Sequence, residues 1–139
     1  LIILLFPNTQ YIINANFGNE NAPTLEMKRA IFGNGLCVRD LRVYSQALDG
    51  TVYHFRDKTG LECDAVVHLR NGSYGLVEIK LGGEKLINEG AKTLLELRDR
   101  IDTTKMKSPS FMMVLTGVGD YAYRRTDGVL VVPVGCLKD

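Results

Sequence analysis

The sequence predicts a single domain of the α/β or α+β class, in which helices flank a mixed β-sheet. Two observations lead to this prediction. The predicted elements follow one another in the order α-β-β-β-α-β-β, and 139 residues suit one domain. A strong hairpin signal, Asn71-Gly72 between two apolar strand candidates, also places antiparallel pairing near the middle of the chain.

The chain before Leu36 is rich in Asn and Gly and carries no pattern that indicates chemistry. Thr24 is suited to cap a short helix, which Gly33 and Gly35 are expected to end. Two short strands are predicted at Ile2–Phe6 and Tyr11–Ile13, a loop at Asn19–Pro23, and the helix at Leu25–Phe32.

From Leu36 onward the apolar residues recur with clear periods, and glycine-containing turns at Asp49-Gly50, Gly82-Gly83 and Asp127-Gly128 divide the elements. Helical periods cover Leu36–Leu48 and the long segment Lys85–Ile101. The five strands of the predicted order are Thr51–Phe55, Leu61–Leu69, Tyr74–Leu81, Phe111–Leu115 and Val129–Val134, and Tyr121–Arg124 is a further candidate.

Composition excludes several classes of protein. Seventeen basic and sixteen acidic residues give a net charge of +1, so no global positive field indicates nucleic-acid binding. The three cysteines are few and far apart, which favours a reducing cytosol over a disulfide framework. No apolar run reaches the length of about 18 residues that spans a membrane. We therefore expect a soluble, cytoplasmic domain without a signal peptide; the missing initiator Met suggests a piece of a longer protein.

One group of residues indicates chemistry. In the strand candidate Tyr74–Leu81, Glu78 and Lys80 share one face because side chains alternate along a strand. On the preceding strand, Asp64 interrupts an apolar run, where a carboxylate needs a partner or a metal. Two carboxylates can hold a hard divalent cation, and a lysine beside them can stabilise developing charge on a phosphate.

The hairpin register decides whether these side chains can meet. A two-residue Asn71-Gly72 turn would leave Asp64 and Glu78 on opposite faces of the sheet. A three-residue loop that ends at Gly72 in the left-handed conformation pairs Leu69 with Ser73 and puts Asp64 across from Glu78. We predict this second register, or an equivalent bulge.

Asp64 followed by Glu78-Ile79-Lys80 resembles the signature of the PD-(D/E)XK nuclease superfamily. The longer stretch from Tyr53 to Asp64, together with Val77–Gly82, is similar to a prokaryotic family of unknown function whose domain closes many AAA+ ATPases. The resemblance covers about Leu36 to the C-terminus. It divides the chain into a segment 1–35, packed on or extending the core, and a nuclease-like domain 36–139.

The resemblance implies a restriction-endonuclease-like α/β fold with a mixed sheet. It implies that Asp64, Glu78 and Ile79 form a site for Mg²⁺ or Mn²⁺, with Asp64, Glu78 and Lys80 catalytic. The expected function is Mg²⁺-dependent hydrolysis of DNA phosphodiesters. The alternative is a non-catalytic accessory or nucleic-acid-binding domain of an AAA+ ATPase-type protein.

Two departures from the family pattern bear on this expectation. Many active members have an acidic residue on the first core helix, and this chain has Asn34 in the corresponding region. The chain also contains no GxxxxGK[ST] motif, so an ATPase domain would have to be supplied as a separate partner.

Other polar residues have ordinary structural interpretations. Glu62 and Asp57 suit a strand end and a turn, His54 and His68 lack zinc-ligand spacing, and Gly117-Val118-Gly119 suits a turn. Two groups are alternative candidates for a nucleic-acid contact surface: Tyr121, Tyr123, Arg124 and Arg125 on a hairpin rim, and Arg98, Arg100, Lys105 and Lys107 near the end of the long helix.

Overall fold

The computed structural model describes residues 6–7 and 25–137. Several predicted features lie outside the described residues: the strand Tyr11–Ile13, the loop Asn19–Pro23, the Thr24 cap, and all of Ile2–Phe6 except Phe6.

A seven-stranded sheet runs through the described part of the chain, in the order β1-β2-β3-β4-β5-β7-β6. The pairs from β1 to β4 are antiparallel, β4 to β5 and β5 to β7 are parallel, and β6 pairs antiparallel with β7. The predicted α/β class with a mixed sheet is therefore confirmed. The strands are β1 (Phe6–Pro7), β2 (Gly50–Arg56), β3 (Glu62–Leu69), β4 (Tyr74–Lys80), β5 (Phe111–Thr116), β6 (Tyr123–Arg124) and β7 (Leu130–Pro133).

The described part of the chain has two helices, α1 (Leu25–Gln46) and α2 (Glu84–Arg100), and a short 3₁₀ turn, η1 (Val134–Cys136), follows β7. The long helix was predicted to within one residue at each end. The predicted stop at Gly33 and Gly35 is wrong, because α1 continues through both. A glycine inside a helix costs only about 1 kcal/mol relative to alanine. Burial of Cys37, Val38 and Leu41 against the sheet outweighs that cost.

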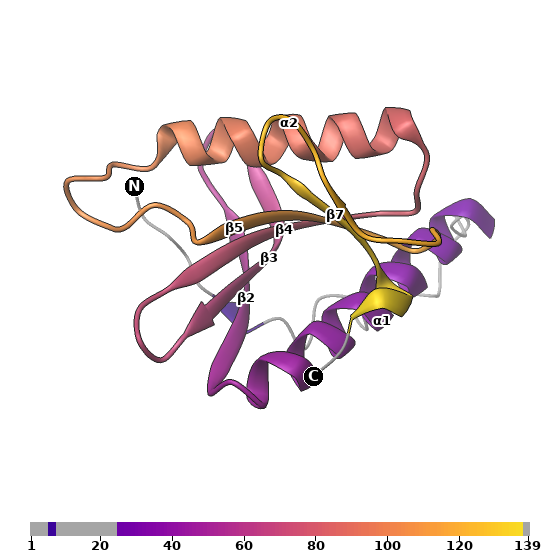
Figure 1. The fold of residues 1–139 in the computed structure, drawn as a ribbon, viewed down its shortest axis with the longest axis horizontal. Coiled ribbons are helices and arrows are strands. Elements are labelled where there is room, and N and C mark those ends of the chain that lie inside the picture. The colour runs from indigo at the N-terminus through magenta and orange to yellow at the C-terminus, as the bar shows by residue number, and fades with distance from the viewer. Residues whose placement is uncertain (1–5, 8–24, 138–139) are drawn as a thin grey trace.

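The helices cover opposite faces of the sheet, as Figure 1 shows. On the α1 face, Leu41 packs with Ala65, Val77 and Leu115 among others. On the α2 face, the buried residues include Ala91, Leu94 and Leu97 of the helix and Val66, Leu76 and Val114 of the sheet. The alternation of side chains along β4 therefore places Val77 and Ile79 toward α1, and Leu76 and Glu78 toward α2.

The connection from β4 to α2 brings the helix close to the end of that strand. Gly82 and Gly83 have φ angles of 135° and 88°, a conformation that residues with a Cβ rarely adopt. These two glycines turn the chain from Lys80 directly into α2, which then crosses back over the sheet to β5. Lys80, the last residue of β4, thus lies beneath α2. Neither described helix is long and apolar enough to cross a membrane.

Candidate functional site

The β3–β4 hairpin adopts the predicted three-residue loop. Gly72 has a φ angle of 84°, its N–H donates to the carbonyl of Leu69 at 3.0 Å, and the N–H of Leu69 donates to the carbonyl of Ser73 at 2.8 Å. His68 pairs with Tyr74, and Ala65 pairs with Val77. This register, rather than that of a tight Asn71-Gly72 turn, is confirmed.

The regular backbone pairing between β3 and β4 ends at Ala65 and Val77. Beyond this point, side chains of β3 form hydrogen bonds with the backbone of β4. Asp64 Oδ2 accepts a hydrogen bond of 2.8 Å from the N–H of Ile79. The thiol of Cys63 donates to the carbonyl of Val77 at 3.3 Å. The Asp64 carboxylate and the Cys63 thiol therefore satisfy backbone groups of β4 that a continuing strand would otherwise pair.

The other edge of β3 is irregular at the same place. Tyr53 pairs with Val66 and Phe55 pairs with Cys63, so that His54 alone opposes Asp64 and Ala65. This is a β-bulge, a feature that redirects side chains and occurs often beside functional sites. In a regular strand, Cys63 and Val66 would point to opposite faces of the sheet, because side chains alternate. The bulge explains why both are buried in the core on the α2 side.

Asp64, Glu78 and Lys80 come together at this irregularity. Lys80 Nζ lies 2.9 Å from Glu78 Oε2, and Glu78 Oε1 accepts a longer hydrogen bond of 3.4 Å from the N–H of Asp64. Glu78 is 4% exposed, whereas the side chain of Lys80 is 26% exposed. The structure thus places two carboxylates and one ammonium beside each other, at the border between core and solvent.

Burial changes the acidity of the two carboxyl groups. Burial and the neighbouring charge of Asp64 raise the pKa of Glu78 to about 7, although Lys80 acts against the rise. Burial also raises the pKa of Asp64, opposed by the N–H of Ile79 and the charge of Lys80. For Lys80, burial is the largest single influence and acts against the charged form. The hydrogen bond that Lys80 donates to Glu78 and the charges of the neighbouring carboxylates together outweigh burial, so the pKa is raised. One ammonium therefore serves two carboxylates in a partly desolvated place.

This donor set fits a hard divalent cation. Mg²⁺ prefers oxygen ligands, retains several waters and is commonly held by only one or two carboxylates. Asp64 and Glu78 supply such carboxylates, and a bound cation would favour their ionised forms. Ile79, predicted within the metal site, has its side chain buried in the core on the α1 face, so that only its backbone belongs to the site. Within residues 6–7 and 25–137, no three His, Cys, Asp or Glu side chains are grouped as metal ligands.

Asn34 belongs to α1, but its side chain lies outside the described residues. The described core residues of α1 pack on the face of the sheet opposite Glu78. The acidic residue that the structure brings toward Lys80 is instead Glu89 of α2, whose charge contributes to the raised pKa of Lys80. His54 likewise acts on Asp64, where its charge partly opposes the rise in pKa that burial causes. Sequence reasoning did not find these two roles, because neither residue has a diagnostic spacing to the other site residues.

The predicted basic surface near the end of α2 is largely neutralised. Arg98 pairs with Asp99, Arg100 pairs with Asp57 and Glu96, and Lys105 pairs with Asp102. Arg100 also donates to Thr59, so the end of α2 contacts the turn between β2 and β3. Arg98, Arg100 and Lys105 are therefore engaged in contacts within the domain.

Of the residues predicted to form a hairpin rim, Tyr123 and Arg124 form the edge strand β6, and Tyr121 and Arg125 flank it. The rings of Tyr121 and Tyr123 are 5.9 Å apart, and Tyr121 is 70% exposed. Arg125, however, is held by Asp127 and donates to Asn88 Oδ1 at 2.6 Å. The loop at Gly117–Gly119 is followed by β6 and not by a helix, which confirms a turn and excludes a dinucleotide loop.

The remaining residues named from the sequence have structural positions. Asp57 accepts hydrogen bonds from Thr59 and from the N–H of Leu61, and so closes its turn. Glu62 forms a long ion pair with Arg56 at 3.9 Å. His68 is exposed on β3, four residues from Asp64.

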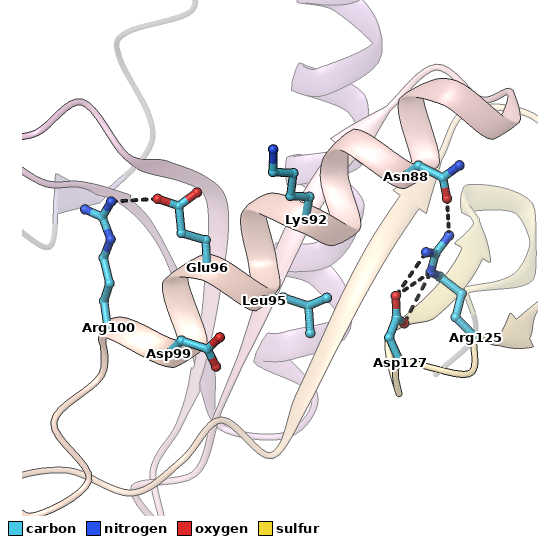
Figure 2. Close-up of a pocket in the computed structure, with 8 residues that line it drawn as sticks. All are labelled: Asn88, Lys92, Leu95, Glu96, Asp99, Arg100, Arg125 and Asp127. Atoms are coloured by element: carbon cyan, nitrogen blue, oxygen red, sulfur yellow. Dashed lines mark hydrogen bonds and ion pairs between the residues drawn. The ribbon is translucent and has the colours of Figure 1, made fainter.

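A pocket of about 490 Å³ lies elsewhere, between the outer side of α2 and the turn that follows β6 (Figure 2). It shares no residue with the candidate site. It is lined by Asn88, Lys92, Leu95, Glu96, Asp99, Arg100, Arg125 and Asp127. Figure 2 shows Arg125 directed at both Asp127 and Asn88 in this pocket.

Comparison with known proteins gives one result. Residues 32–137 match the family described as a domain of unknown function, DUF4143. The chain belongs to the DUF4143 family. The matched region includes Asp64, Glu78 and Lys80, and it contains strands β2 to β7 and helix α2. Neither the curated proteins nor the solved structures contain a match to this chain.

Proposed function

We propose that this DUF4143 domain is a metal-dependent phosphodiesterase of the PD-(D/E)XK type, acting on DNA. The observation that carries the proposal is the convergence of Asp64, Glu78 and Lys80, with the lysine 2.9 Å from Glu78. Two carboxylates beside one lysine at the end of a β-hairpin match the arrangement that the sequence resemblance implies.

Asp64 and Glu78 are the residues that would hold Mg²⁺ or Mn²⁺. The ion, when bound, polarises a phosphate and lowers the pKa of a coordinated water. The N–H of Ile79 holds Asp64 in place, which fixes the orientation of its carboxylate. The ammonium of Lys80 is partly exposed and can stabilise negative charge that develops on a phosphate.

Cleavage assays test this proposal directly. Plasmid and single-stranded DNA are incubated with the protein and Mg²⁺ or Mn²⁺. We expect Lys80→Ala to lower the cleavage rate at least about 100-fold, the range seen when one group that stabilises developing charge is removed. Lys92→Ala is the matched control, because Lys92 is an exposed lysine on the outer side of α2. Absence of cleavage by the wild type, or equal cleavage by Lys80→Ala, would reject the proposal.

Calorimetric titration with Mn²⁺ separates binding from catalysis. We expect the wild type to bind Mn²⁺ and Glu78→Ala to bind at least about tenfold more weakly, because one of two carboxylate ligands is gone.

A second candidate function is a non-catalytic accessory domain that serves an AAA+ ATPase-type partner. It is favoured by the pairing of Glu78 with Lys80, which leaves both groups satisfied in the absence of a metal. It predicts that Mn²⁺ does not bind, and that Glu78→Ala changes stability and not activity. The pairing of Arg98, Arg100 and Arg125 with acidic neighbours weighs against a role in DNA binding alone.

A further inference from the structure

Gly90 occupies an unfavourable position for a glycine. It is buried in the interior of α2, where glycine is less favourable than alanine. Gly90 is also not among the glycines with positive φ, so that its backbone conformation does not require glycine. The explanation has to come from the space around it.

The space beside Gly90 is filled by the stem of Lys80. A Cβ added at Gly90 would lie 3.3 Å from Cε and 3.4 Å from Cγ of Lys80, and 3.2 Å from Cγ2 of Val114. These distances are shorter than the 3.5–4.0 Å or so at which carbon atoms attract each other best. The missing side chain thus leaves the room through which Lys80 passes under the helix.

The position of the Lys80 stem determines where its ammonium can be. Val114, which also borders the room, pairs with Glu78 in the register between β4 and β5. A methyl group at position 90 would therefore require the Lys80 stem or the Val114 side chain to shift by a few tenths of an ångström. A lysine side chain loses much rotamer freedom when it is fixed in one position. The α2 backbone at Gly90 restricts the stem on the helix side.

We infer that Gly90 is a positioning residue for Lys80, since its lack of a side chain opens the channel that leads the ammonium to Glu78. Its effect on cleavage rests on the proposed function, whereas its packing with Lys80 does not.

A double-mutant cycle on stability tests the packing without any assay of activity. The equilibrium constant of unfolding is measured in urea for Gly90→Ala, for Lys80→Ala and for the double variant. With Lys80 shortened, we expect Gly90→Ala to be at least about fivefold more favourable for folding than it is in the wild type, because the helix propensity of alanine is then realised. An equal effect of Gly90→Ala in both backgrounds would overturn the inference. Gly135→Ala is the control, because its Cβ would meet nothing within 4 Å.

Kinetics then distinguish positioning from a merely structural role. We expect Gly90→Ala to lower kcat at least about tenfold, with the KM for DNA and the affinity for Mn²⁺ within about threefold of the wild type. The substitution should have no further effect on cleavage when it is added to Lys80→Ala. An unchanged kcat, or a loss confined to KM, would overturn the positioning role.

Two further outcomes remain interpretable. If the wild type does not cleave DNA, the proposed function fails and the stability cycle alone decides the inference. If Gly90→Ala does not fold, Val114→Ala is added to relieve the shortest of the three contacts, and the same cycle is measured in that background.

Discussion

Carboxylates and basic side chains lie on both sides of α2, buried against the sheet on the inner side and open to solvent on the outer side. On the inner side, Asp64 and Glu78 share the single ammonium of Lys80 and are largely removed from water. On the outer side, the pocket of Figure 2 is lined by three basic and three acidic residues, open to solvent. The outer set is neutral by count, whereas the inner set has one negative charge in excess when all three groups are ionised.

The pKa directions follow this difference. On the outer side, the hydrogen bond from Arg125 lowers the pKa of Asp127, as expected of a carboxylate with a partner of its own. On the inner side, burial raises the pKa of Glu78 to about 7. The same chemical group is thus stabilised as an anion on one side of the helix and favours its protonated form on the other. On the inner side, an added cation would favour the ionised forms of the two carboxyl groups.

The largest expected effect concerns the apolar contacts that hold α2 on the sheet. Leu94 is fully buried, whereas its neighbour Leu95 is partly buried and lines the outer pocket. Leu94→Ala should lower the free energy of unfolding by about 3 kcal/mol, since it leaves a cavity in the core. Leu95→Ala should cost less than half as much. Urea unfolding of both variants measures this, and equal losses would show that the two sides of α2 are packed alike.

Stability should fall with rising pH because of Glu78. Between pH 4.5 and 7 the folded state retains a proton that the unfolded chain has released, since the folded pKa is the higher one. The contribution is fully present at low pH and is lost as the pH rises through about 7. The loss amounts to at most about 3 kcal/mol at 1.36 kcal/mol for each pKa unit.

Urea unfolding of wild type and Glu78→Gln from pH 4.5 to 8 measures this loss. We expect Glu78→Gln to show a smaller fall, because the amide does not titrate. Asp127 has a lowered pKa, so its contribution changes only in more acidic solution. Parallel profiles of the two proteins would contradict the role assigned to Glu78.

Breaking the ion pair on the inner side should have a moderate effect. At pH 8, Lys80→Met should lower the free energy of unfolding by about 1–2 kcal/mol, because two carboxylates then lack a cationic partner. Toward pH 5 the loss should shrink, since Glu78 takes up a proton. Lys92→Met on the outer side is the matched control and should change little at either pH. A loss for Lys80→Met that does not depend on pH would contradict the raised pKa assigned to Glu78.

The smallest effect is expected on the outer side. Arg125→Ala removes a partly exposed ion pair with Asp127 and should cost about 0.5 kcal/mol, and less at high salt. Urea midpoints at low and high salt check both statements. If Arg125→Ala cost as much as Lys80→Met, the difference in solvent exposure would not explain the energies of the two ion pairs.

Much of this architecture could be predicted from the sequence where a local signal dominates. Gly72 favours the left-handed conformation of a three-residue loop, and that loop fixes the register that brings Asp64 toward Glu78. The period of apolar residues defined α2 to within one residue at each end. The break predicted at Gly33 and Gly35 was wrong because two glycines weigh less than the apolar face that α1 buries.

The order of strands and helices, the hairpin loop and the identity of Asp64, Glu78 and Lys80 as neighbours were determined by the sequence itself, through short-range preferences and the two-residue period of a strand. Only the tertiary structure decided the bulge at Asp64, the insertion of the Cys63 thiol beside β4, and the passage of Lys80 under Gly90. These features depend on contacts between segments far apart in the chain, whose burial sets both the space and the pKa values, and no local pattern encodes them.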